Sequence, residues 1–305
     1  MSEMYNADNL FEQLSKNGVE IDEQKKRLIQ DKISRMLNYE PRIGIFGKTG
    51  AGKSSLCNAL FGREVCEISD VAACTRNPQE VILNIAGGKG MKIVDVPGVG
   101  ENSQRDQEYG ELYARLLPEL DVVLWVLKGD DRAYASDENF YKNLVKPHLD
   151  QGKPFFFVLN QVDKIEPFRE WDVDKHEPGP NQYMNIDKKV QSVATCFEVP
   201  ASKVIPVSAN EKFNMTKLVD EMIYALPNEK KITVFKGVNE EFRSEATGEK
   251  VKHSVMDAIR EVVGNALDNA YDAVCDTIDR ITDFGDRVVG GICNFIDGFF
   301  DFFNL

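Results

Sequence analysis

Short runs of apolar residues recur through the middle of the chain, separated by segments with helical spacing. The runs are continuous rather than alternating, which is typical of strands covered on both faces of a sheet. They occupy residues 42–46, 81–85, 93–96, 122–127, 155–159 and 204–207. Helical patterns near residues 105–117, 137–146, 186–197 and 214–225 fill the connections. This alternation predicts an α/β fold with a doubly wound, mostly parallel sheet.

Both ends of the chain carry a helical pattern instead. Residues 7–38 predict two polar helices with one apolar face each. From Val251 to Phe303 apolar residues recur at steps of three or four, interrupted near Gly285 and at Gly290 and Gly291. The sequence therefore predicts N-terminal helices at 1–39, an α/β domain at 40–226 and a C-terminal amphipathic helical region at 227–305.

Residues 166–185 are too long for a plain connection between a strand and a helix. They form either a functional insertion or a partly disordered loop.

Charge and cysteine content narrow the possible partners. The formal net charge is −13, with no basic run, so a long contact with a nucleic-acid backbone is disfavoured. The six cysteines lack C-x-x-C spacing, and the first residues lack the pattern of a secretory signal. No apolar run has the length of a bilayer span. We expect a cytoplasmic protein that is at most peripheral to membranes.

One octapeptide carries the strongest chemical signal. It follows the G-x-x-x-x-G-K-[ST] spacing of a P-loop and consists of Gly47, Lys48, Thr49, Gly50, Ala51, Gly52, Lys53 and Ser54, with Ser55 next. A predicted strand precedes it and an apolar-faced helix follows. In this arrangement backbone N–H groups cradle phosphates, Lys53 reaches the outer phosphates and the Ser54 hydroxyl ligates Mg²⁺. The alternative, a glycine-rich turn that matches by accident, conflicts with both flanks.

Two further segments fit the phosphate end of the same site. Asp95 ends a buried strand in the sequence Asp-Val-Pro-Gly, where a carboxylate can hold Mg²⁺ through water and the N–H of Gly98 can face the γ-phosphate. Thr75 lies in a predicted loop before the second strand, where its hydroxyl can ligate Mg²⁺ while the γ-phosphate is present. Most loop threonines are solvated or cap a helix, but the position of Thr75 favours the role of metal ligand.

A base-reading segment follows the fifth strand. In Asn160-Gln161-Val162-Asp163, the Asp163 carboxylate can accept from two donors on guanine, which adenine does not offer. Ser208 and Ala209 end the sixth strand, where a backbone N–H can meet the guanine carbonyl. GTP and GDP are the expected ligands.

The ordered set of these five segments resembles the nucleotide-binding motifs of the TRAFAC-class GTPases over roughly residues 40–226. It is most similar to bacterial Era/TrmE-like GTPases, including a prophage-associated group that resembles 50S ribosome-binding GTPases. The P-loop wording is also similar to that of septin, immunity-related and chloroplast-import GTPases. The resemblance implies an enzyme that hydrolyses GTP to GDP and phosphate, with Lys53, Thr75 and Gly98 as its catalytic residues.

Three positions depart from the family pattern. Gln161 stands where the base-reading motif usually has lysine, which predicts modest guanine affinity. Val99 stands where related enzymes orient water with glutamine, which predicts slow intrinsic turnover. Gly50 replaces the asparagine of potassium-activated members, so potassium stimulation is not expected. Arg76 is either a source of transition-state charge or simply solvated.

The C-terminal region has two readings. It forms either a helical hairpin packed on the rest of the chain, or an aromatic terminus for a partner's groove or self-association. The second reading rests on Phe295, Phe299, Phe300, Phe302 and Phe303. The polar face is acidic, which disfavours a lipid surface.

The sequence therefore favours a guanine-nucleotide switch activated by homodimerisation or by a protein partner on its C-terminal helices. The alternatives are a scaffold that holds GTP or GDP without turnover, and a ribosome- or RNA-associated GTPase. The acidic balance argues against the last.

Overall fold

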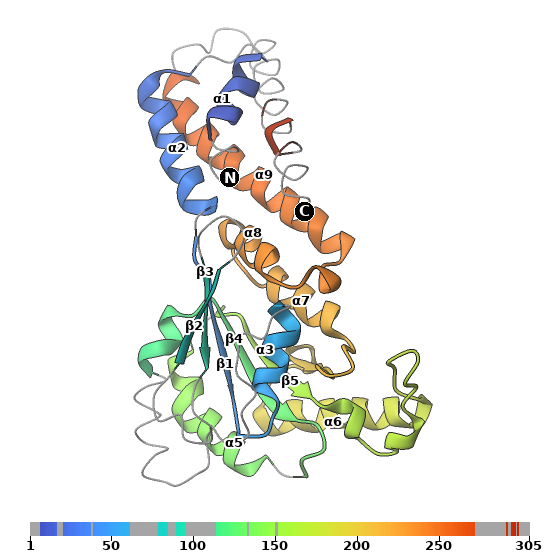
Figure 1. Ribbon diagram of the computed structural model, residues 1–305. Helices are drawn as coiled ribbons and strands as arrows, with labels where there is room; N and C mark the ends of the chain where they lie inside the picture. The colour runs from blue at the N-terminus through green and yellow to red at the C-terminus, as the bar shows by residue number, and fades with distance from the viewer. Residues whose placement is uncertain are drawn as a thin grey trace.

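A computed structural model describes residues 7–16, 21–37, 39–61, 79–84, 90–95, 114–132, 134–149, 152–271, 291, 294–296 and 298. The described part has an α/β body and a helical arm that projects from one end of it (Figure 1). Its strands are β1 (Arg42–Gly47), β2 (Gln79–Asn84), β3 (Gly90–Asp95), β4 (Val122–Lys128), β5 (Phe155–Asn160) and β6 (Val204–Pro206). All six coincide with the predicted runs to within a few residues.

The strands form one sheet in the order β2-β3-β1-β4-β5-β6. β3, β1, β4, β5 and β6 are parallel, while β2 pairs antiparallel to β3. The carboxyl ends of the parallel strands therefore meet at one edge, where ligands of such sheets bind. This confirms the predicted doubly wound, mostly parallel sheet.

Helices cover both faces of the sheet. On one face lie α3 (Lys53–Phe61) and α7 (Met215–Tyr224), and on the other lie α5 (Ala135–Phe140) and α6 (Pro180–Phe197). The predicted helix at 137–146 is broken into α5, a π-helical turn at Tyr141–Val145 and a 3-10 turn at Lys146–His148. Other 3-10 turns are Leu117–Glu119, Val162–Lys164, Phe168–Glu170, Ala201–Lys203 and Glu240–Phe242.

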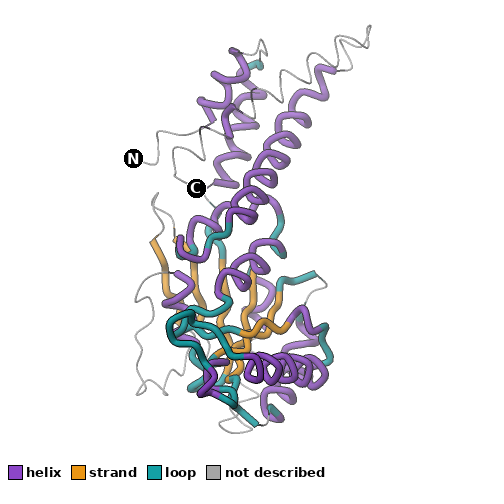
Figure 2. Tube along the Cα trace, turned by 90° about the vertical axis from the view of Figure 1, so that its right-hand side faces the viewer, coloured by secondary structure: helices purple, strands orange, loops and turns teal. Residues whose placement is uncertain are grey.

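The arm contains helices from both ends of the chain. It is built from α1 (Ala7–Lys16), α2 (Glu23–Leu37) and α9 (Glu245–Tyr271), with α8 (Asn228–Gly237) between arm and sheet. Figures 1 and 2 show α2 and α9 side by side, away from the sheet. Leu10, Leu14 and Ile29 are fully buried there together with α9 side chains.

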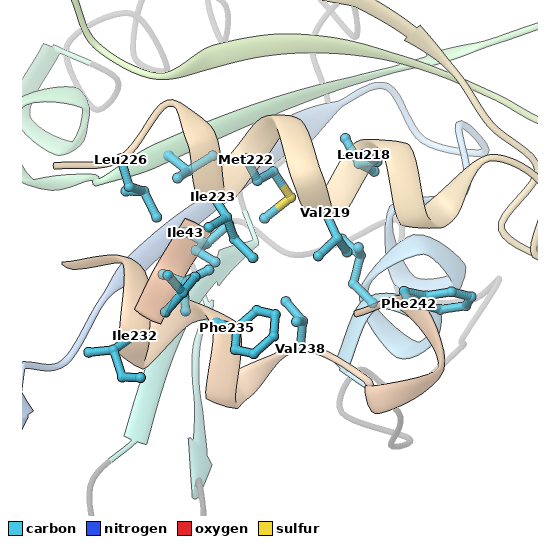
Figure 3. Packing of buried hydrophobic residues seen from close by; sticks show 14 of the residues in the cluster. Ile43, Leu218, Val219, Met222, Ile223, Leu226, Ile232, Phe235, Val238 and Phe242 are labelled. Atoms are coloured by element: carbon cyan, nitrogen blue, oxygen red, sulfur yellow. The ribbon is translucent and has the colours of Figure 1, made fainter. Parts of the chain in front are cut away.

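One hydrophobic cluster joins the arm to the sheet without a break. It runs from Ile43 on β1 through α7 and α8 to Val251, Val255 and Ile259 on α9. Figure 3 shows the middle of this cluster, where side chains of α7 face Ile232, Phe235 and Val238. The arm is therefore packed against the body and is not a separate bundle.

The structure bears on the C-terminal readings at one aromatic residue. Phe295 is 1 % exposed and belongs to the same cluster, which fits a packed helical hairpin. Phe299, Phe300, Phe302 and Phe303 lie outside the described residues. The domain boundaries at 39 and 226 remain a prediction. No helix in the described segments combines the length and apolarity that a bilayer crossing needs.

Candidate functional site

The P-loop connects the end of β1 to the start of α3 at the carboxyl edge of the sheet. Gly47 has φ +138, and a Cβ there would lie 2.2 Å from the carbonyl oxygen of Val126. Any side chain at this position would collide with the neighbouring strand, which explains the glycine. The ammonium group of Lys53 donates to the carbonyl oxygens of Gly47 at 2.9 Å and of Lys48 at 3.2 Å. Lys53 thus lies across the loop, where phosphate oxygens bind in P-loop proteins.

Asn160 joins three segments of the site. Its side chain is buried at the end of β5. The amide nitrogen donates to the carbonyl oxygen of Ala51 at 3.0 Å, and the amide oxygen accepts from the N–H of Ala209 at 3.1 Å. One side chain therefore fixes the P-loop, the end of β5 and the segment after β6 relative to one another.

The predicted base-reading residues are brought together. The hydroxyl of Ser208 donates to a carboxylate oxygen of Asp163 at 2.6 Å. The N–H of Ser208 donates to the carbonyl oxygen of Phe213, and that of Ala209 to Asn160. The backbone N–H groups of Ser208 and Ala209, one of which we expect to meet guanine, both have acceptors here, so that contact remains a prediction.

Gln161 reaches back to the P-loop from the base-reading segment. Its backbone is left-handed, with φ 63 and ψ 36. Its side-chain nitrogen donates to the carbonyl oxygen of Gly50 at 2.9 Å, and its side-chain oxygen accepts from the ammonium group of Lys164 at 2.8 Å. Lys164 was not singled out from the sequence, because it lies outside the motif.

The segment 166–185 is ordered and supports the same loop. Gln182 is fully buried and donates to the carbonyl oxygens of Asp163 and Ile165, each at 2.9 Å. The Glu170 carboxylate accepts from the N–H groups of Asn181 and Gln182 in the first turn of α6. The partly disordered alternative is therefore wrong, and the segment braces the turn that carries Asp163.

The P-loop has a further neighbour on the side of α5. The Lys48 ammonium lies 2.6 Å from a carboxylate oxygen of Asp137, whose side chain is 2 % exposed. Burial raises the pKa of the Asp137 carboxyl, while Lys48 and Trp125 oppose this shift. A pocket of about 220 Å³ lies beside the pair, between the P-loop and residues 126–137. The only hint of Asp137 in the sequence is an acidic residue at the start of a predicted helix.

The residues expected at the γ-phosphate are only partly placed. Thr75, Arg76, Gly98 and Val99 lie outside the described residues. Asp95 ends β3, where its backbone is in register with Ile45 of β1, but its side chain is outside the described set.

Ser54 stands in the first turn of α3, directly after Lys53. Within the described ranges, no group of three or more His, Cys, Asp or Glu side chains forms a metal cage. A hydroxyl at the P-loop fits a Mg²⁺ site in which nucleotide phosphate oxygens and water supply further ligands.

One family model and several curated proteins are similar to this chain in sequence. The model of a family described as 50S ribosome-binding GTPase matches residues 42–161. The uncharacterized protein YfjP of Escherichia coli (strain K12) is 42% identical over 243 residues, which are 80% of each chain. The uncharacterized protein YkfA of the same strain is 38% identical over 248 residues, again 80% of each chain.

A crystal structure of Era from Aquifex aeolicus bound to GDP and AlF4⁻ is 27% identical and has a TM-score of 0.46. It covers 61% of this chain, which in turn covers 56% of it.

Proposed function

Because this chain belongs to the Era-like family of TRAFAC-class P-loop GTPases, and so binds and hydrolyses GTP, we propose that it is a switch that relays nucleotide state to its helical arm. Lys53 binds the outer phosphates and Asp163 selects guanine. Mg²⁺ would be held by Ser54, Thr75 and Asp95, where it would screen the phosphate charge. We also propose that the protein acts in the cytoplasm.

One observation supports the relay. Helix α3 starts at the P-loop Lys53, and near its other end the carbonyl oxygen of Leu60 accepts from the N–H of Asn239 at 2.7 Å. Asn239 precedes the short turn between α8 and α9. A rigid helix therefore links the phosphate loop to the base of the arm, so movement at one end displaces the other.

Activation by self-association or by a partner protein completes the proposal. Val99 cannot hydrogen-bond to the attacking water, so another group must orient it. A second copy of the chain, or a partner protein that reaches the nucleotide, can supply that group. Turnover by an isolated protomer is expected to be slow.

GTP hydrolysis per protomer, measured across a wide range of protein concentration, tests this. We expect activity per protomer to rise with concentration, ATP to be a poor substrate, and Lys53→Ala to lose nucleotide binding while remaining folded. Retained tight GTP binding by Lys53→Ala would refute the nucleotide assignment. Flat, slow turnover would point to an external activator.

Ribosome association is a second candidate, because the matching family is described by its binding to the 50S subunit. The net charge of −13 works against extended contact with RNA. Co-sedimentation with ribosomes at several salt concentrations, in GTP and in GDP, tests it. Binding that depends on GTP and survives moderate salt would support this role.

A further inference from the structure

The base-reading segment and the P-loop are joined by two amide side chains. Asn160 donates to the carbonyl oxygen of Ala51, and Gln161 donates to that of Gly50, the residue before it. The approach is close: a Cβ on Gly52 would lie 2.4 Å from the Asn160 amide nitrogen and 3.2 Å from that of Gln161. The two loops therefore hold each other in position.

The two amides differ in how firmly they are held. Asn160 is buried and has a protein partner on each side of its amide. Gln161 is only half-buried, and its contact with Gly50 is exposed to water. Water competes for an exposed hydrogen bond and lowers its net contribution. A second contact to the Gln161 side chain, although it is also exposed to water, helps to keep the amide on Gly50.

Lys164 supplies that contact. Its ammonium group donates to the Gln161 side-chain oxygen at 2.8 Å, and its backbone N–H donates to the Gln161 carbonyl oxygen at 3.1 Å. The first bond fixes which end of the amide faces Gly50, because an ammonium group can only donate. It also polarises the amide, which strengthens the N–H donated to Gly50.

The location gives this chain of bonds its function. Asp163 lies between Gln161 and Lys164 in the 3-10 turn Val162–Lys164. Gly50, at the other end, has φ +81 and shapes the P-loop. A single chain of hydrogen bonds therefore connects the turn that carries the base-reading carboxylate to the loop that carries the phosphate ligands.

We propose that Lys164 is a positioning residue for guanine-nucleotide binding, which acts through Gln161 to lock the base-reading turn onto the P-loop. This rests on the proposed function. It also revises the expectation of modest affinity drawn from Gln161 alone: the pair Gln161–Lys164 provides both a contact to the P-loop and a positive charge beside the base site.

The test measures the dissociation constants of GDP, GTP and ATP for the full chain and for matched variants. Lys164→Met removes the charge and keeps the stem, Lys164→Arg keeps a cation, and Gln161→Met removes the amide. Lys188→Met is the control, because Lys188 is an exposed lysine on α6 whose contact is with Asn185 at 3.5 Å.

We expect Gln161→Met to weaken GDP and GTP binding about five- to tenfold, and Lys164→Met about threefold. Lys164→Arg should bind GDP and GTP nearly as tightly as wild type, because it keeps a cation at this position. The double variant should be no weaker than Gln161→Met alone, because Lys164 acts through Gln161. Higher salt should weaken the wild type more than Lys164→Met. Thermal midpoints and the control should stay near wild type.

The outcomes separate the two proposals. If the wild type shows no preference for GDP and GTP over ATP, the proposed function fails. If it does, but Lys164→Met binds as tightly as wild type, the role of Lys164 is wrong. The role of Lys164 would also be wrong if Lys164→Met weakened GDP and GTP binding equally in the wild-type and Gln161→Met backgrounds.

Discussion

Lys48 of the P-loop and Asp137 of α5 form an ion pair of 2.6 Å in which the carboxylate is almost completely buried. The P-loop is thus tied to α5 by a side chain as well as to the base-reading segment. An ion pair in this position holds the outer part of the loop, next to Thr49 and Gly50, in one conformation. The pair therefore lies at the loop that we propose binds the phosphates.

Asp137→Asn is expected to weaken nucleotide binding more than it weakens the fold. The variant removes the charge that holds Lys48, but Lys48 is 29% exposed and can turn to water. Burial already opposes the ionised carboxylate, so we expect a loss of only about 1–2 kcal/mol in unfolding free energy. Isothermal titration with GDP should show a loss of about tenfold or more. Asp187→Asn, on the exposed side of α6, is the control; equal affinities in both variants would contradict the prediction.

Asp121 ties the base of the arm to the sheet. Its carboxylate accepts from the Tyr39 hydroxyl at 2.8 Å, from the N–H of Arg42 at 2.8 Å and from the Lys230 ammonium at 2.8 Å. Lys230→Met leaves a buried charge with one donor fewer, so we expect about 2–4 kcal/mol of destabilisation in urea unfolding.

The exposed pair of Lys212 and Glu241 provides the comparison for Lys230. Its partners are 56% and 49% exposed. Lys212→Met should cost no more than about 1 kcal/mol. If the two variants were equally stable, Asp121 would not be the anchor that its contacts suggest.

Lys236 predicts a dependence of stability on pH. Burial, with the neighbouring Arg243, lowers the pKa of Lys236 to about 8 from its ordinary 10.5. Between these values the unfolded chain holds a proton that the folded chain has lost. Stability from this group therefore rises with pH across that window, by less than about 1.4 kcal/mol per unit because the group is partly exposed.

The check on Lys236 is the difference in unfolding free energy between wild type and Lys236→Met. At pH 7.5, about half a unit below the folded value, the variant should be the more stable of the two. The gap should narrow steadily toward pH 10. A gap that does not change with pH would rule out the shift.

The Cys196 thiol is expected to react slowly with alkylating reagents. Burial, together with a hydrogen bond to the Glu138 carboxylate at 2.9 Å, raises the pKa of the Cys196 thiol to about 11. Glu138→Gln removes the negative charge that favours the protonated form, so the pKa should fall toward its ordinary value of 9.0. Alkylation of this residue at pH 8.5, followed by mass spectrometry of its peptide, should become several-fold faster. An unchanged rate would show that burial alone sets the pKa.

The strands and the P-loop could be predicted because their signals are local. A buried apolar run, a glycine loop and an apolar-faced helix follow one another between Arg42 and Phe61. The antiparallel direction of β2 was not predicted, because an apolar run carries no direction. The short connection from Asn84 to Gly90 contained that information, since it has no room for a crossover helix.

The contacts that complete the site could not be predicted. The pairs Lys48–Asp137 and Leu60–Asn239 join residues far apart in the chain, and no spacing rule relates them. Gln161 was identified as a departure from the family motif, but its effect depends on Lys164, whose side chain reaches it only because the segment forms a 3-10 turn. Sequence identified which groups are present, and the fold determined which of them touch.

The shared core of the arm also constrains how the protein folds. Leu10 and Leu14 of α1 pack in one cluster with Val255 and Ile259 of α9, and the whole sheet lies between them in the sequence. Contacts of such high sequence separation form late, because loop closure must precede them. During synthesis the apolar faces of α1 and α2 therefore cannot pack against α9 until α9 has left the ribosome. Until then these faces are open to chaperones or to other chains, and we expect the packing of α1 and α2 on α9 to form late in folding.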